Sequence, residues 1–153
     1  MKDFKPVNIL LVEDNEDDIL IIERAFKKTK VINELYVVRD GQEGLDFILH
    51  EGIYAQTKPS TPGLILLDIN MPKMNGFQVL EKIKAHPVYK VIPVIMLTVS
   101  DRDEDIAKSY QNGATSYITK PMNFEDFVKV IEHFEIYWSL VSKVPEVRGR
   151  EIG

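Results

Sequence analysis

The residues best suited to chemistry in this sequence are polar side chains that stand at the ends of short apolar runs. Glu13 and Asp14 follow one such run, Asp68 follows a second, Thr98 ends a third, and Lys120 comes just after a weaker one. Taken singly, each has an ordinary explanation as a helix cap, a strand residue or a solvated charge. Asp68 is harder to dismiss, because charged residues rarely continue a buried strand. Their shared placement predicts a functional cluster.

A cluster that contains three carboxylates needs a cation. Two carboxylates about 4 Å apart repel by about 4 kcal/mol at an effective dielectric of about 20, and a third adds to the repulsion. Lys120 supplies one positive charge, and oxygen ligands without histidine or cysteine nearby suit Mg²⁺. An ion beside Asp68 would screen an incoming phosphoryl group, so Asp68 becomes a candidate nucleophile that forms an acyl phosphate. Thr98 and Lys120 would then contact phosphoryl oxygens.

The apolar runs themselves predict the sheet that brings these residues together. Five short runs, which are continuous as expected of strands buried on both faces, occupy residues 8–12, 35–38, 64–67, 94–97 and 115–118. Segments with helical spacing separate and follow them. This alternation predicts an α/β domain, a doubly wound (βα)5 fold with a five-stranded parallel sheet, flavodoxin-like, and helices on both faces. Because ligands bind beyond the carboxyl ends of such strands, the polar residues are expected at one edge.

The last two helical segments differ in how much apolar surface they carry. The segment 101–112 has only Ile106, Ala107 and Tyr110 on its apolar face. Few contacts would hold this helix, so we expect it to move at low cost. The final segment, 124–141, is apolar around more of its circumference than one domain face requires. We therefore expect a homodimer built on this last helix.

Composition limits the possible function classes. The chain has 153 residues, enough for one domain, which we expect at 1–142 with its motif-bearing core at 7–134 and a C-terminal tail at 143–153. It has no cysteine, which excludes disulfides, thiol nucleophiles and thiolate metal sites. A net charge of −5 argues against nucleic-acid binding, and no apolar run reaches the roughly 20 residues of a membrane span. The N-terminus lacks signal-peptide features, so a cytoplasmic protein is expected.

Four blocks of the sequence resemble the signature blocks of response-regulator receiver domains. They are VNILLVEDNEDD at 7–18, LILLDINMPKMNG at 64–76, PVIMLTVS at 93–100 and GATSYITKPMN at 113–123. The blocks occur in the family's order and include all five motif positions. The resemblance implies these roles: Asp68 as phosphoacceptor; Glu13, Asp14, Asp68 and the backbone carbonyl of Asn70 as Mg²⁺ ligands; Thr98 as switch hydroxyl; Lys120 as phosphate partner; and Tyr117 as the aromatic residue that changes rotamer.

The resemblance also implies a function, that of a single-domain response regulator in two-component signalling. A sensor histidine kinase or a histidine phosphotransfer protein would phosphorylate it, and it would catalyse only its own phosphorylation and dephosphorylation. The phosphoryl group would change the surface of the fourth helix, fifth strand and fifth helix, and so control partner binding, dimerisation or phosphorelay. Val99 stands where the family more often has Ala, Ser or Thr, so we expect narrower access to the phosphoryl group.

A closer likeness is to stand-alone receivers of the cyanobacterial phytochrome-associated type. It rests on the VEDNEDD start, the extended connection before residue 64 and the FEIYWSL segment of the last helix. With 153 residues we expect no output domain, so transfer of the phosphoryl group or phosphorylation-dependent binding of a partner is the expected mode of action.

Three other functions use similar residues on a similar fold. A Mg-dependent aspartyl phosphatase of the haloacid-dehalogenase class typically needs a second aspartate two residues after its nucleophile, where this chain has Asn70, which cannot protonate a leaving group. A flavin-binding flavodoxin needs hydroxyl groups and glycine amides after the first strand, where this chain offers Glu13, Asp14, Glu16 and Asp17. A pseudo-receiver that is never phosphorylated is opposed by the presence of all five motif positions, and a phosphodonor experiment decides the matter.

Overall fold

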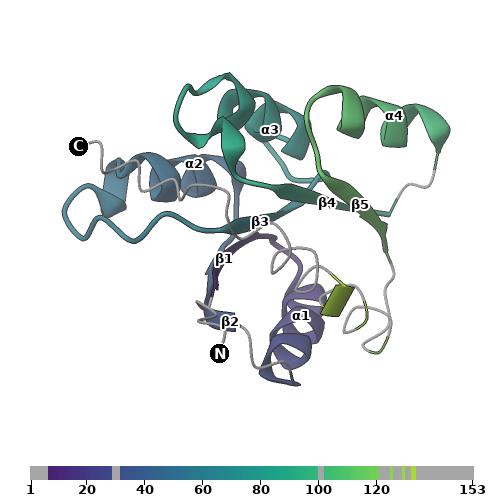
Figure 1. Cartoon of the computed structure of the whole chain (residues 1–153), viewed down its shortest axis with the longest axis horizontal. Helices are drawn as coiled ribbons and strands as arrows, with labels where there is room; N and C mark the ends of the chain where they lie inside the picture. Colours follow the sequence, from purple (N-terminus) through teal and green to yellow (C-terminus); the bar gives the residue numbers. More distant parts are fainter. Residues whose placement is uncertain are drawn as a thin grey trace, which may run out of the picture.

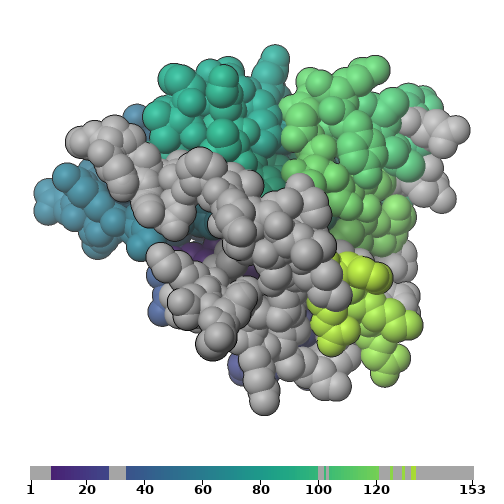
Figure 2. Space-filling model, viewed as in Figure 1, coloured from purple at the N-terminus to yellow at the C-terminus, as the bar shows by residue number. Residues whose placement is uncertain are grey.

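The computed structural model describes residues 7–28, 32–99 and 102–120, together with helical positions 125, 129, 132 and 133. The tail at 143–153 lies outside the described residues. So do most of the expected last helix and the apolar side chains on which the expected homodimer depends. The side chains at the four helical positions are exposed and form a yellow-green patch on one face of the molecule in Figure 2.

Five parallel strands form one sheet in the order β2-β1-β3-β4-β5. The strands are β1 (Val7–Val12), β2 (Ile32–Val38), β3 (Leu64–Asp68), β4 (Val94–Thr98) and β5 (Ser116–Thr119). The chain moves outward from β1 to β2 and then returns to place β3 on the other side of β1, so the strand order reverses between β1 and β3. This confirms the doubly wound α/β fold, and the carboxyl ends of β1 and β3 lie where such sheets bind ligands.

Helices cover both faces of the sheet (Figure 1). Helix α1 (Glu16–Lys28) lies on one face, and α2 (Gly41–Leu49), α3 (Gly76–Ala85) and α4 (Asp103–Gln111) lie on the other. Two short 3₁₀ helices, η1 (Gly52–Tyr54) and η2 (Tyr89–Val91), lie in the connections before β3 and β4. The alternation of strands and helices is the one that the apolar runs predict.

The core consists of two apolar layers, one on each face of the sheet. Successive strand residues point to opposite faces, so Leu10 and Val12 belong to the layer under α2 and α3, whereas Ile9 and Leu11 belong to the layer under α1. Every residue of β3 and β4 is buried. Burial on both faces explains why these strands appear in the sequence as continuous apolar runs.

Helix α4 packs differently from the predicted pattern. Ala107 and Tyr110 are exposed and Ile106 is only partly buried, so the predicted apolar face is wrong for two of its three residues. The helix instead buries Ser109, whose hydroxyl donates a hydrogen bond to the carbonyl oxygen of Asp105 at 3.0 Å. A hydroxyl that has a hydrogen-bond partner is buried at little cost. The prediction that few apolar contacts hold this helix still stands.

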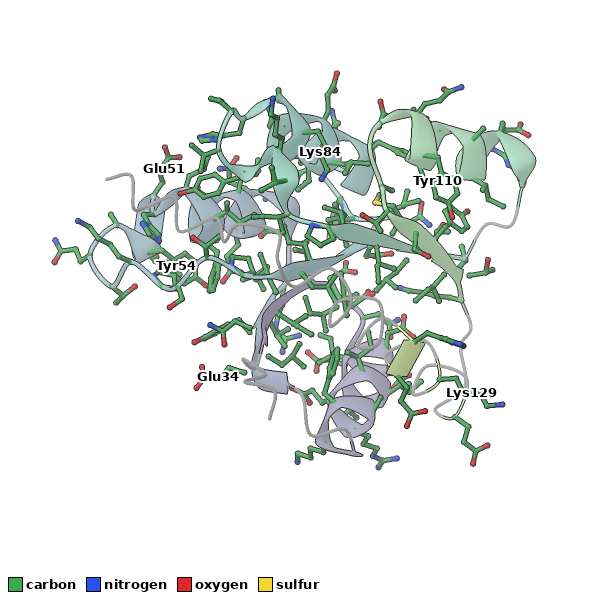
Figure 3. The ribbon with its side chains drawn as sticks, viewed as in Figure 1. Glu34, Glu51, Tyr54, Lys84, Tyr110 and Lys129 are labelled. Carbon is green, nitrogen blue, oxygen red and sulfur yellow. The ribbon has the colours of Figure 1, made fainter. Side chains whose placement is uncertain are left out.

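The extended connection between α2 and β3 is exposed along most of its length but is anchored at its start. The ring of Tyr54 packs edge-on against Phe47 with 5.1 Å between ring centroids, and Phe47 in turn contacts Tyr36 at 5.2 Å. The Tyr54 hydroxyl donates a hydrogen bond to Glu43 at 2.8 Å. Tyr54 therefore ties the connection to α2 (Figure 3).

Candidate functional site

The polar residues that follow the apolar runs lie at the carboxyl edge of the sheet. Strand β1 leads into Glu13 and Asp14, β3 ends at Asp68, β4 ends at Thr98, and β5 leads into Lys120. The parallel register aligns these strand ends from β1 across to β5. Residues more than a hundred positions apart in the sequence thus meet at one edge.

The ammonium group of Lys120 joins three carboxylates, two of them buried and one partly buried, in a cluster that we call the acidic pocket. Its Nζ atom lies 2.8 Å from Glu13 Oε1, 2.8 Å from Asp18 Oδ2 and 3.3 Å from Asp68 Oδ1. The backbone N–H of Asn70 also donates to Asp68 Oδ1, at 3.4 Å. An ammonium group has three N–H donors, so these three carboxylates are enough to use all of them.

Burial controls the protonation of this pocket. Burial raises the pKa of Glu13 to about 7, although the hydrogen bond from Lys120 opposes the shift. Burial likewise raises the pKa of Asp68, again against the attraction of Lys120. For Lys120 itself, burial would lower the pKa, but the hydrogen bonds to Asp18 and Glu13, together with the negative charges of Asp68 and Glu13, raise it. One ammonium group shared by several buried carboxylates leaves the pocket short of positive charge.

Glu13, Asp14 and Asp68 form a group that fits a hard divalent cation. One carboxylate oxygen from each lies within 4.8 Å of the others, and Asp14 is exposed while the other two are buried. An ion in this group would therefore be accessible from solvent on the Asp14 side. Oxygen ligands of this kind suit Mg²⁺, which keeps several of its waters when bound.

Close packing of α3 fixes the end of β3 that carries Asp68. A Cβ atom added at Gly76 would lie 2.4 Å from the carbonyl oxygen of Asp68, so only glycine fits there. The N–H of Gly76 donates to the carbonyl oxygen of Ile69 at 2.9 Å. Asn75 and Gln78 form a reciprocal capping box that fixes where α3 begins. The first turn of α3 thus packs against the backbone of Asp68 and holds it in place.

The other predicted site residues lie at different depths around this pocket. Thr98 is buried at the end of β4, and the next residue, Val99, is exposed. Asn70 is exposed two residues beyond Asp68. Tyr117 lies on β5, partly buried against the apolar layer under α2 and α3. Among the predicted site residues, Lys120 thus contacts Glu13 and Asp68 directly, while Tyr117 lies further back along the sheet.

Sequence reasoning missed Asp18. Asn15 caps α1, because its Oδ1 atom accepts a hydrogen bond from the N–H of Asp18 at 3.0 Å. Asp18 is therefore the third residue of the helix, from which an acidic side chain commonly turns back to the N–H of the cap. Here Glu13 takes that N–H at 3.1 Å, and the Asp18 carboxylate contacts Lys120 instead. The spacing of Asn15 and Asp18 marks a helix start in the sequence, but it does not reveal this contact.

Comparison with known proteins gives this pocket a context. The family described as "Response regulator receiver domain" matches residues 9–132. The chain belongs to the receiver domain family. Receiver domains are signalling domains that histidine kinases phosphorylate, so this is the general function of the present receiver domain. The resemblance found in the sequence is thereby confirmed.

Relatives match this receiver domain over most of its length. The probable methanogenesis regulatory protein FilR2 of Methanothrix harundinacea is 40% identical over 134 residues, a match that covers 87% of this chain and 84% of FilR2. Response regulator Rcp1 of Synechocystis sp. is 38% identical over 133 residues, which covers 87% of this chain and 89% of Rcp1.

Solved structures of phytochrome response regulators share the fold of this receiver domain. The phosphorylated cyanobacterial phytochrome response regulator RcpA has a TM-score of 0.77 and 39% identity, and the match covers 90% of this chain and 96% of RcpA. The Mn²⁺-bound form of Rcp1 has a TM-score of 0.79 and 36% identity, covering 92% of this chain and 100% of Rcp1. The Mn²⁺-bound relative and the acidic group together support a divalent-metal site in this receiver domain.

In the part of the chain that the structure describes, every helix is too short or too polar to cross a membrane.

Proposed function

We propose that Asp68 accepts a phosphoryl group from a sensor histidine kinase or a histidine phosphotransfer protein. The observation that carries this proposal is the contact between the Asp68 carboxylate and the Lys120 ammonium inside a buried acidic pocket. An Asp68 oxygen forms a bond to phosphorus while the bond from phosphorus to the donor histidine nitrogen breaks. The electron pair stays on that nitrogen, which takes a proton from solvent, and Asp68 becomes an acyl phosphate.

The charge in the pocket makes Mg²⁺ the cofactor of this proposal. Glu13, Asp14, Asp68 and the backbone carbonyl of Asn70 would hold the ion, which when bound offsets negative charge on the phosphoryl oxygens. The raised pKa values of Glu13 and Asp68 support a need for further positive charge. Lys120 would pair with one phosphoryl oxygen while it remains in contact with Glu13.

The proposed response to phosphorylation passes through Thr98 and Tyr117. Thr98 would move toward the phosphoryl group and donate a hydrogen bond to it, and Tyr117 would rotate into the space that is released. The surface formed by α4, β5 and the last helix would then change, which would control partner binding, dimerisation or phosphorelay. The partial burial of Ile106 supports this route, because α4 can shift without breaking a large apolar contact.

The domain boundaries, the location in the cell and the oligomeric state are proposed from the sequence. The receiver domain would span 1–142 with its motif-bearing core at 7–134, followed by a tail at 143–153. The protein would act in the cytoplasm without binding nucleic acid or membrane, and would form a homodimer through its last helix. A monomer mass at every concentration, in both the free and the phosphorylated forms, would contradict the homodimer.

The central proposal is tested with a small phosphodonor. Acetyl phosphate or phosphoramidate with Mg²⁺ should add one phosphoryl group to the wild-type chain, as measured by intact mass, and should add none to Asp68→Asn. Chelation of the metal should suppress the addition to the wild type. A phosphoryl group that still appears on Asp68→Asn would overturn the assignment of the site, and a wild type that never gains one would support a pseudo-receiver.

Val99 is proposed to limit access to the phosphoryl group. Its side chain is 67% exposed beside the buried Thr98. Val99→Ala removes two methyl groups and is expected to raise the rate of phosphoryl transfer or of phosphoryl loss. Both rates can be followed by intact mass after addition and after removal of the phosphodonor. If neither rate changes, Val99 has no role in access.

A further inference from the structure

The Asp18 carboxylate contacts the ammonium group of Lys120. The proposed phosphoryl transfer gives Asp18 no role. Its Oδ2 atom lies as close to Nζ as Glu13 does, 2.8 Å in both cases, and closer than Asp68 at 3.3 Å. The side chain of Asp18 is 17% exposed, against 0% for Glu13 and 4% for Asp68. Asp18 is therefore the partner of Lys120 that is nearest to solvent.

The local structure of α1 directs Asp18 toward the lysine. Asn15 holds the backbone N–H of Asp18, and Glu13 holds the backbone N–H of Asn15, so the cap of the helix is complete without the Asp18 carboxylate. The positive end of the helix dipole favours a negative charge in this first turn. The acidic group that fits a cation consists of Glu13, Asp14 and Asp68 and does not include Asp18. Asp18 thus acts on the lysine and not on the metal position.

The number of donors on Lys120 makes its partners competitors. Its three N–H donors already face three carboxylates, so an arriving phosphoryl oxygen must displace one of them. Glu13 is fully buried and would be left without its cation. Phosphorylation turns the Asp68 carboxylate into an acyl phosphate, whose negative charge lies on the phosphoryl oxygens and no longer on the carboxyl group. Asp18 keeps its charge and can turn to water. Asp18 is the group that continues to compete with the phosphoryl oxygens for the ammonium group.

We propose that Asp18 is a positioning residue that holds Lys120 in the unphosphorylated protein and competes with the phosphoryl group for it. Asp18 thereby lowers the affinity of the pocket for a phosphoryl group on Asp68. This inference rests on the proposed function, because it requires Asp68 to be the site that carries the phosphoryl group. It concerns an equilibrium, so it can be tested with an analogue that binds without a covalent step.

The test is the affinity for beryllofluoride, a phosphoryl analogue, at saturating Mg²⁺. Its dissociation constant is measured by titration calorimetry for the wild type, Asp18→Asn, Asp18→Glu and Asp17→Asn. Asp17 is exposed on the same turn of α1, so its substitution removes the same charge without touching Lys120. We expect Asp18→Asn to bind beryllofluoride about fivefold more tightly than the wild type, the effect of one partly exposed ion pair. Asp18→Glu keeps the charge and should restore wild-type affinity, and Asp17→Asn should leave it unchanged.

A second measurement separates competition for Lys120 from a general change in charge. The affinity for Mg²⁺ without beryllofluoride should be the same in Asp18→Asn and Asp17→Asn, because Asp18 is not in the metal group. The inference is overturned if Asp18→Asn binds beryllofluoride no more tightly than Asp17→Asn, or if it alone loses Mg²⁺ affinity. Asp18→Ser, which also removes the charge, repeats the test should the asparagine variant fail to fold. A wild type that binds no beryllofluoride would overturn the proposed function itself, an outcome distinct from equal binding by all variants.

Discussion

Helices α1 and α4 both follow strands that end at the acidic pocket around Lys120, but they are held in different ways. Helix α1 buries four apolar side chains against the sheet and places Asp18 on Lys120. Helix α4 buries only a serine among the residues described, and its Tyr110 is half exposed. Packing on the α1 side fixes the positions of charges, whereas packing on the α4 side leaves the helix lightly held.

This difference separates two requirements of a switch. Charged groups must keep fixed distances if they are to orient a phosphoryl group, since a small displacement changes each ion pair. A surface that reports the phosphoryl group must change shape at low cost, which requires few buried contacts. The α1 side of the pocket meets the first requirement, and the α4 side meets the second.

The largest expected effect comes from a matched pair of substitutions on the two helices. Ile22 is fully buried in α1, whereas Ile106 in α4 is only partly buried. Ile22→Ala leaves a cavity beside the sheet and should lower the free energy of unfolding by about 2 to 5 kcal/mol. Ile106→Ala should lower it by about 1 kcal/mol or less. Urea unfolding of both variants and the wild type measures the difference.

The pair carries its own control. Both substitutions remove the same atoms and add the same helix propensity, so the difference between them reports packing alone. The slope of free energy against urea should be equal in all three proteins if folding stays two-state. Equal losses of stability in the two variants would show that α4 is held as firmly as α1, and the proposed division between the helices would be wrong.

A smaller effect is expected at the turn that ends α4. Gly113 has a φ angle of +100°, and a Cβ atom added there would lie 2.9 Å from Cγ of Lys84. Gly113→Ala should therefore cost about 1 to 2 kcal/mol, from backbone strain and from the displaced lysine. Thermal and urea unfolding of Gly113→Ala in the wild-type and Lys84→Ala backgrounds separate the two causes. A cost that vanishes in the Lys84→Ala background would leave no part for backbone strain.

The sheet and the edge where the polar residues meet could be predicted from the sequence, because strands that are buried on both faces have apolar residues at every position. Strands β3 and β4 are buried at every residue, and such strands are continuous apolar runs. The parallel order then brings the strand ends to one edge, which is why Asp68 and Lys120 could be expected near each other. The face of α4 could not be predicted, since Ser109 is buried through a hydrogen bond to Asp105 rather than through apolar character.

Asp18 shows a second limit of sequence reasoning. It stands beside Glu16 and Asp17 in an acidic first turn of α1, where the helix dipole alone explains negative charge. Only the tertiary structure distinguishes it from Asp17, because one carboxylate contacts Lys120 and the other is exposed. Contacts between residues distant in the sequence leave no periodic pattern, so the charge network of the pocket had to come from the fold.

The smallest expected effect is a pH dependence at Lys84 (Figure 3), which links α3 to η2 and lies beside Gly113 in the turn after α4. Its Nζ atom donates to the carbonyl oxygens of Lys90 at 2.8 Å and Ile92 at 2.7 Å. Burial lowers the pKa of Lys84 below its usual 10.5, so the unfolded chain binds this proton more tightly than the folded protein does. The contribution of Lys84 to stability is therefore reduced at neutral pH and rises as the pH approaches 10.5.

The neutral amine keeps two N–H donors, enough for both carbonyl oxygens, so loss of the proton leaves these hydrogen bonds in place. The free-energy difference between the wild type and Lys84→Met, from urea unfolding, should therefore grow between about pH 7 and about pH 10. Lys82→Met, which removes the same charge from an exposed position of α3, is the matched control. A difference for Lys84→Met that stays constant with rising pH would mean that folding does not lower the pKa of this lysine, and a difference that shrinks would mean that the fold stabilises its charge. If the difference shrinks, the charged lysine stabilises the turn after α4 at neutral pH. This side of the molecule would then be held more firmly than the comparison with α1 predicts.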